Sequence, residues 1–126
     1  MITICYMNGD FTITDFKGLL VIEVMVEKFD FFLISEHSLR LRGLLEERHY
    51  PSIIFDFTRV KFIDSSVFGF LLEVRNTVEK QGNDIAIVCS DPDVLHVMRM
   101  LKVPQVMQVF GNRDKAEDYL NSLKDM

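Results

Sequence analysis

Three short apolar segments alternate with three segments of helical character in the part of the chain that follows Pro51. The apolar segments are Ile53–Phe57, Ile85–Cys89 and Val106–Phe110. Near-continuous apolar runs of this length are typical of strands that are buried on both faces. A strand, a helix and a further strand form a right-handed crossover between parallel strands. The alternation therefore predicts a parallel sheet with helices packed against it.

Each apolar segment is followed by a signal for the start of a helix. The first helix is expected to run from Ser65 to about Lys80, because an apolar stripe follows that serine. Its inward residues are expected to be Phe68, Leu71, Leu72, Val74 and Val78. The second helix is expected to start at Asp91-Pro92, and the last helix is expected to be capped by Asn112.

The first third of the chain has the pattern of half-buried antiparallel strands. Residues Ile2–Tyr6 and Phe11–Phe16 alternate between apolar and polar side chains on either side of the turn signal Asn8-Gly9-Asp10, and Leu19–Val26 is a longer apolar run. A helix is then expected to begin at Ser35. The inward residues of that helix are expected to be Leu39, Leu41, Leu44 and Leu45.

These signals together predict one α/β domain over residues 1–126. The sheet is expected to be mixed, with antiparallel N-terminal strands and parallel later strands, and about four helices should pack against it. The chain has 126 residues, of which 48% are hydrophobic and 26% are charged. A chain of this size and composition forms a core without disulfides or metal.

Charge and composition exclude several classes of protein. The net charge is −5, and Arg40, Arg42 and Arg48 alternate with glutamates, so we expect no nucleic-acid partner. No apolar run is long enough to span a membrane, and the N-terminal residues lack the basic stretch of a signal peptide. Cys5 and Cys89 are too far apart in the sequence to indicate a zinc site or a disulfide framework. We therefore expect a cytoplasmic protein with reduced, buried thiols.

The segment Ile63–Leu72 places two hydroxyl groups and a carboxylate at the expected start of a helix. The first backbone N–H groups of a helix lack partners within the helix, and the helix dipole favours negative charge there. Two interpretations follow for Ser65 and Ser66. One serine is an ordinary N-cap, or one of them is a site where a phosphoryl group is electrostatically stabilised.

The residues around this segment resemble a known family. The features that carry the resemblance are the strand Ile53–Phe57, the segment Phe62-Ile63-Asp64-Ser65-Ser66, Gly69 and the pair Leu71-Leu72. They are similar to the signature of STAS domains, and within that family they are most similar to the bacterial anti-sigma factor antagonists. The similarity extends from about Ile22 to Leu123.

The resemblance implies a partner switch that regulates transcription. In this family the unmodified antagonist binds an anti-sigma factor that is also a serine kinase, and the sigma factor is thereby released. The kinase then phosphorylates a serine of the antagonist, the complex separates, and a serine phosphatase restores the unmodified state. The acceptor in the family is the first serine after the aspartate, which is Ser65 here, while Ser66 corresponds to a cap or packing residue.

The sequence departs from the family pattern directly after the two serines. Family members usually have glycine at the position of Val67, whereas Gly69 is retained. Because valine is bulkier than glycine and excludes unusual backbone angles, we expect extra bulk at the turn that faces the kinase. This departure bears on the phosphorylation step more than on the fold.

A second departure lies upstream, in a segment that the resemblance places beside the phosphoacceptor. Asp30 corresponds to an aspartate of the family, but it is surrounded by Phe29, Phe31, Phe32 and Ile34. These apolar side chains are either part of the core or an apolar patch for a partner. Under the second interpretation, the partner-binding residues are Asp30, Phe31 and Phe32.

Asp56, at the end of a predicted central strand, is a further neighbour of the site. Its carboxylate either makes structural hydrogen bonds, or it orients the turn or coordinates a water or metal during phosphotransfer.

An enzymatic function has little support in the sequence. Neither Ser65 nor Ser66 lies in a Gly-x-Ser-x-Gly motif, and no motif links His37, His49 or His96 to an orienting acid. Phosphate-binding glycine motifs are also lacking. We therefore expect a binding protein without cofactor or metal. The alternative to the phosphorylated switch is a STAS scaffold that is not phosphorylated, or an accessory module of a signalling complex or a lipid-transport system.

Overall fold

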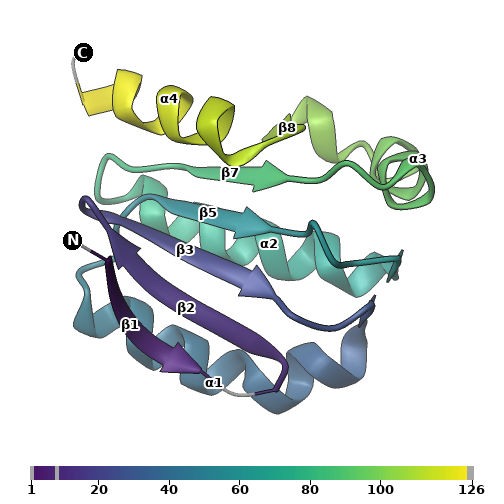
Figure 1. Cartoon of the computed structure of the whole chain (residues 1–126), viewed down its shortest axis with the longest axis horizontal. Helices are drawn as coiled ribbons and strands as arrows, with labels where there is room; N and C mark the ends of the chain where they lie inside the picture. Colours follow the sequence, from purple (N-terminus) through teal and green to yellow (C-terminus); the bar gives the residue numbers. More distant parts are fainter. Residues whose placement is uncertain (1, 8, 125–126) are drawn as a thin grey trace.

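The computed structural model describes residues 2–7 and 9–124, and for residues 2–7 it describes the backbone alone. Figure 1 shows the chain from N-terminus to C-terminus. Its elements are β1 (Ile2–Met7), β2 (Phe11–Phe16), β3 (Leu19–Val24), β4 (Lys28–Phe29), α1 (Phe31–Glu47), β5 (Ile53–Asp56), β6 (Phe62–Ile63), α2 (Ser65–Glu79), β7 (Ile85–Val88), α3 (Pro92–Met100), a 3₁₀ turn (Val103–Gln105), β8 (Gln108–Phe110) and α4 (Arg113–Lys124).

The main sheet is mixed, as the sequence predicts. Its strand order is β1-β2-β3-β5-β7-β8. The pairs β1–β2 and β2–β3 are antiparallel, and the pairs β3–β5, β5–β7 and β7–β8 are parallel. The strand–helix–strand alternation after Pro51 therefore forms the parallel half of the sheet, and the alternating N-terminal segments form the antiparallel half.

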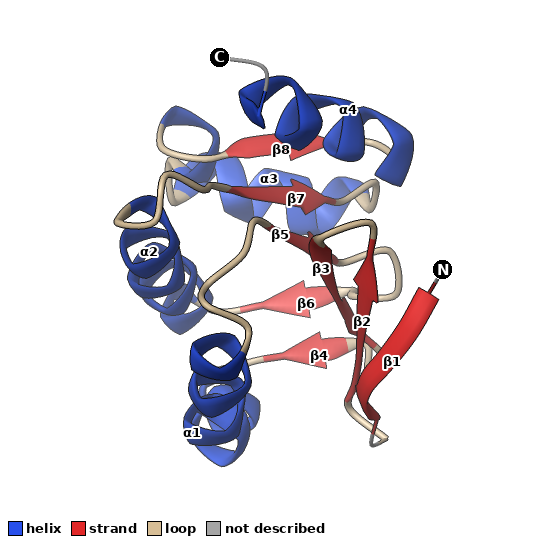
Figure 2. Ribbon diagram, turned by 90° about the vertical axis from the view of Figure 1, so that its left-hand side faces the viewer, coloured by secondary structure: helices blue, strands red, loops and turns tan. Residues whose placement is uncertain are grey.

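Helices cover both faces of this sheet. Helices α1 and α2 lie on one face, and α4 lies on the other (Figure 2). The larger core lies beneath α1, α2 and α3 and contains Phe29, which is fully buried. The ring of Phe29 makes edge contacts with the rings of Phe11, Phe57 and Phe70 at centroid distances of 5.5–6.2 Å. A smaller core beneath α4 includes Ala116 and Leu120.

Helix α1 begins four residues earlier than expected, at Phe31 instead of Ser35. Asp30 is the N-cap, because its backbone is extended and its Oδ1 accepts the N–H of Leu33 at 3.1 Å. The inward stripe is also different: His37, Leu41 and Leu45 are buried, whereas Leu39 is 82% exposed. The prediction is confirmed for Leu41 and Leu45, and Leu44 is partly buried against the core. It was wrong for Leu39, which lies on the opposite side of the helix, while His37, four residues before Leu41, is on the inward side.

The other helices begin where the sequence predicts. Helix α2 starts at Ser65, Asp91 caps α3, and Asn112 accepts the N–H of Lys115 at the start of α4. The expected inward face of α2 needs one correction. Phe68 and Leu72 are only partly buried, and the fully inward positions are Val67, Phe70, Leu71, Val74 and Val78.

Cys89 is 2% exposed, as expected for a buried thiol, and burial raises its pKa to about 11. The side chain of Cys5 lies outside the described part of the structure. Among the described residues, none of the helices is both long enough and apolar enough to cross a membrane.

Candidate functional site

A two-stranded sheet, which the sequence did not predict, brings the starts of α1 and α2 together. Strands β4 and β6 are parallel, with Lys28 opposite Phe62 and Phe29 opposite Ile63. Each strand leads directly into a helix, so the next residues, Asp30 and Asp64, are the N-caps of α1 and α2. The two short strands lie side by side in Figure 2. The pairing therefore brings two helix N-termini to one end of the molecule.

The carboxylate of Asp64 contacts both helices. Its Oδ1 accepts the backbone N–H of Ser66 at 3.0 Å and the Ser66 hydroxyl, while its Oδ2 accepts the backbone N–H of Phe31 at 3.1 Å. One carboxylate thus satisfies N–H groups at the N-termini of α1 and α2, which would otherwise lack partners. Asp64 fixes the position of Phe31 relative to the serine segment.

These hydrogen bonds lower the pKa of Asp64. Partial burial acts in the opposite direction and raises the pKa, but the hydrogen bonds from the Ser66 hydroxyl and from the N–H groups of Phe31, Ser66 and Val67 together outweigh it. The pKa therefore lies below its ordinary value of 3.8.

A lowered pKa means that Asp64 stabilises the fold when it is ionised. Its contribution should be fully present above pH 3.8, the ordinary value, and should be lost as the pH falls through the lower folded-state value. An Asp64→Asn variant should be less stable than wild type at pH 7, because its amide nitrogen cannot accept the N–H of Phe31. Urea unfolding measures the free energy of unfolding of both proteins at pH 7 and near pH 2. The difference between wild type and Asp64→Asn should be smaller near pH 2. A difference that stays constant over this range would contradict the assignment.

The two serines differ in their surroundings. Ser65 is exposed at the first position of α2, and its hydroxyl makes no hydrogen bond to any other described residue. Ser66 is partly buried, and its hydroxyl is held by Asp64. The structure thus places one hydroxyl on the surface and uses the other within the cap.

Val67 does not add bulk at the surface, contrary to the expectation from the sequence. Its side chain is 1% exposed and packs within the larger core. Val67 shares the inward stripe of α2 with Leu71, Val74 and Val78, at helical spacings of three and four. The departure from the family pattern therefore changes the core beneath the turn and leaves the exposed surface at Ser65 unaltered.

Gly69 lies one helical turn after Ser65, on the same face of α2. It is exposed, and a Cβ atom at this position would meet no atom within 4 Å. Because glycine is unfavourable inside a helix, the fold of the isolated chain gains nothing from it. The open space leaves room for another backbone to approach α2 closely.

Replacing Gly69 with alanine should raise the free energy of unfolding by about 0.5–1 kcal/mol. Gly82→Ala is a suitable contrast, because Gly82 has a φ of +79° and alanine is strained there. That variant should be destabilised, by more than Gly69→Ala is stabilised. Chemical denaturation measures both changes, and a destabilised Gly69→Ala protein would show that this glycine serves the fold.

The aromatic segment before and within α1 is divided between core and surface. Phe29 is fully buried and Ile34 is partly buried, whereas Phe31 is 57% exposed and Phe32 is 79% exposed. The core interpretation is therefore confirmed for Phe29 and, in part, for Ile34, while a partner patch stays a prediction for Phe31 and Phe32. Phe31 and Phe32 are surface residues, with ring centroids 6.1 Å apart.

Phe62 is a third exposed aromatic residue at this end of the molecule; the sequence placed it in the family signature but not among the partner-binding residues. It is 49% exposed, and the Lys28 ammonium lies 5.5 Å from the centroid of its ring. Its place in β6, two residues before Asp64, puts it close to the serine segment. We call Ser65, Gly69, Phe31, Phe32 and Phe62 together the Ser65 surface.

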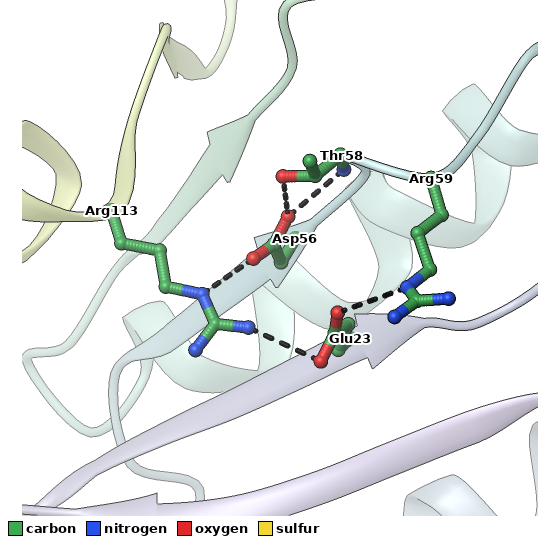
Figure 3. A network of polar contacts seen from close by, with 5 residues as sticks. All are labelled: Glu23, Asp56, Thr58, Arg59 and Arg113. Atoms are coloured by element: carbon green, nitrogen blue, oxygen red, sulfur yellow. Dashed lines mark hydrogen bonds and ion pairs between the residues drawn. The ribbon is translucent and has the colours of Figure 1, made fainter.

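Asp56 makes structural hydrogen bonds, which is one of the two roles considered for it. It is 3% exposed, and its Oδ1 accepts the N–H of Thr58 at 2.9 Å and also the Thr58 hydroxyl. Its Oδ2 accepts Nε–H of Arg113 at 2.5 Å (Figure 3). The guanidinium of Arg113 also lies 3.3 Å from Glu23, which Arg59 contacts at 3.6 Å. This network connects the ends of β3 and β5 to the start of α4.

Ser65 lines neither of two hollows found on the described surface. One, of about 150 Å³, lies between α1 and α2 near Tyr50 and Thr77. The other, of about 230 Å³, lies between α4 and the sheet near Phe16 and Val21. The Ser65 surface has three exposed aromatic side chains, which is typical of protein recognition more than of a small-molecule pocket.

Solved structures share this fold. An anti-sigma factor antagonist from Mycobacterium paratuberculosis superimposes with a TM-score of 0.77 at 15% identity, over 96% of this chain and 95% of that one. The unphosphorylated anti-sigma factor antagonist SpoIIAA gives 0.71 at 18% identity, over 89% and 96%. The phosphorylated form of the Bacillus cell fate determinant SpoIIAA gives 0.64 at 18% identity, over 86% and 97%.

No curated protein matches the chain significantly. The family assignment comes instead from the sequence itself, which matches the STAS domain over residues 12–116. This match spans most of the chain and includes the Ser65 segment, both paired short strands and the parallel half of the sheet. The protein is therefore a member of the STAS domain family.

Proposed function

We propose that this protein is an anti-sigma factor antagonist. In its unphosphorylated form it binds an anti-sigma factor that has serine-kinase activity, and phosphorylation of Ser65 releases it. The observation that carries the proposal is the contrast between the serines: Ser65 is exposed at the start of α2, while Asp64 holds the hydroxyl of Ser66. Several neighbours in fold are anti-sigma factor antagonists, which supports the same role.

The electrostatics of the α2 N-terminus support a reversible phosphoryl group. A phosphoserine at position 65 would carry a charge of about −1.5 to −2. The dipole of α2, positive at this end of the helix, favours such a charge in the isolated chain. A partner in contact with the same surface would have to desolvate the dianion, next to the carboxylate of Asp64, so phosphorylation favours dissociation.

The exposed aromatic residues give the partner an apolar anchor. Phe31 and Phe32 are next to the N-terminus that Asp64 fixes, and Asp30 caps the same helix. Large aromatic side chains provide much of the binding energy in protein interfaces. We assign Asp30 to positioning these rings and Phe31 and Phe32 to contact with the partner. A serine phosphatase would restore the unmodified form.

Binding of the purified anti-sigma factor kinases encoded in the same genome tests this proposal. Phe31→Ala should weaken binding to the cognate kinase by about tenfold or more, since an aromatic anchor in an interface is worth at least ~1.4 kcal/mol. The free energy of unfolding should stay nearly unchanged, because the ring is already exposed. Isothermal titration calorimetry and urea denaturation measure the two quantities.

Met100→Ala is the matched control, because Met100 is 68% exposed on α3. It should leave both binding and stability unchanged. If none of these kinases binds the wild-type chain, the antagonist role is wrong. If a kinase binds stably but transfers no phosphate to the chain, the protein is instead a STAS scaffold or accessory module.

A further inference from the structure

The outward face of α1 has an unusual apolar character. Phe32 and Leu39, seven residues apart, lie on the side opposite the buried residues His37 and Leu41. They are 79% and 82% exposed, more than the other large apolar side chains that the described surface exposes. Gly43 continues the row one turn further and is also exposed. We call Phe32, Leu39 and Gly43 the α1 crest.

Gly43 leaves an open position within this helix. A Cβ atom there would meet no atom within 4 Å, and the backbone does not have the positive φ that would require glycine. Glycine inside a helix is unfavourable unless something uses the space. Nothing among the described residues of this chain occupies it.

We propose that the α1 crest is an interface between two copies of this chain, packed antiparallel about a twofold axis. Such an interface must be complementary to itself, because the same patch contributes from both subunits. In an antiparallel pair of helices, residues on either side of the axis face each other when they are equidistant from it. Phe32 of one copy therefore lies over the open position at Gly43 of the other when the axis passes between residues 37 and 38 of α1.

The charges on one flank of the crest specify the same axis. Glu36 and Arg40 are exposed on the flank nearest His37, and the point midway between them is residue 38. At the 1.5 Å rise of a helix, this axis differs from the Phe32–Gly43 axis by less than ~1 Å. In an antiparallel pair related by a twofold axis, the same flanks of the two helices face each other, so Glu36 of each copy meets Arg40 of the other.

This coincidence favours a second copy over an unrelated partner. A different protein that covers the crest would not require the aromatic–glycine pair and the charge pair to share one midpoint. Leu39 lies next to the axis, where it packs against the crest of the other copy. A single pair of helices is smaller than a standard interface, so the association is a weak one.

The Ser65 surface and the α1 crest share Phe32. If the function proposed above is correct, the pair of chains and the complex with the anti-sigma factor therefore exclude each other. The pairing itself does not depend on that function, and its test needs only this chain.

Sedimentation equilibrium from a few micromolar to about a millimolar protein covers the range expected for a small interface. Wild type should associate to dimers within this range. Leu39→Ser should weaken the association at least tenfold, since two copies of an apolar contact are lost. Met100→Ser, which removes a similarly exposed apolar side chain from α3, should have no effect. Circular dichroism melts establish that both variants remain folded.

A charge exchange tests the predicted register. Glu36→Arg places Arg opposite Arg twice, and Arg40→Glu places Glu opposite Glu twice, so each variant alone should associate at least tenfold more weakly than wild type. An equal mixture of the two variants should associate again, because both contacts between unlike chains are then of opposite charge. A monomeric wild type, an unaffected Leu39→Ser variant or a mixture that stays monomeric would each overturn the proposal.

Discussion

Phosphorylation of Ser65 is expected to weaken binding to the anti-sigma factor kinase by at least about 100-fold, or ~2.7 kcal/mol. Two effects combine in this expectation. The partner loses its packed contact with the Ser65 hydroxyl. Binding must also remove water from the phosphoryl dianion at the N-terminus of α2. The Asp64 carboxylate, already ionised because its pKa is lowered, adds like charge beside it.

Calorimetry with enzymatically phosphorylated chain measures this loss directly, with the chain dephosphorylated by a serine phosphatase as the matched control. Ser65→Asp should reproduce part of the loss, because aspartate has less charge and fewer oxygens than a phosphoserine. Ser66→Ala should retain most of the affinity, since the Ser66 hydroxyl is held within the cap. Equal affinity of the phosphorylated and unphosphorylated chains would contradict the switch.

Arg113→Met is expected to lower the free energy of unfolding by about 2 kcal/mol. Glu23 and Asp56 are opposite each other on the parallel strands β3 and β5. Arg113 contacts both carboxylates from the start of α4 (Figure 3). Without the guanidinium, the buried carboxylate of Asp56 loses its cation and is repelled by the neighbouring carboxylate of Glu23, which destabilises the folded state.

Urea denaturation provides the measurement, and two variants make it specific. Arg59→Met is the matched control: Arg59 contacts only Glu23 in this network, at 3.6 Å, and is 59% exposed, so its loss should cost no more than about 0.5 kcal/mol. Adding Glu23→Gln to Arg113→Met should recover part of the stability, because one of the two facing charges is then removed. Equal losses in the two arginine variants would show that the network is not held together by Arg113.

The mixed sheet and three of the four α-helix starts could be predicted from the sequence, because each depends on local patterns. Apolar runs of strand length and capping residues such as Asp91 and Asn112 act within a few residues of their position. The start of α1 was missed for a local reason as well. Asp30 has the chemistry of an N-cap, but the aromatic residues that follow it resemble a buried segment more than the first turn of a helix.

The arrangement of the site depends on contacts that the sequence pattern does not contain. Strands β4 and β6 have two residues each, too few for any periodicity, and they exist because they pair with each other. The bond from Phe31 to Asp64 joins residues 33 positions apart, and the bond from Arg113 to Asp56 joins residues 57 apart. The burial of Val67 is different, since its spacing to Leu71 and Val74 already indicated an inward position.

The most direct test of the account is the intact mass of the chain after incubation with its anti-sigma factor kinase and ATP, followed by peptide mapping. Wild type and Ser66→Ala should each gain one phosphoryl group, located on residue 65 in both, and Ser65→Ala should gain none. A phosphoryl group on Ser66, or an unchanged mass of the wild-type chain despite stable complex formation, would contradict it.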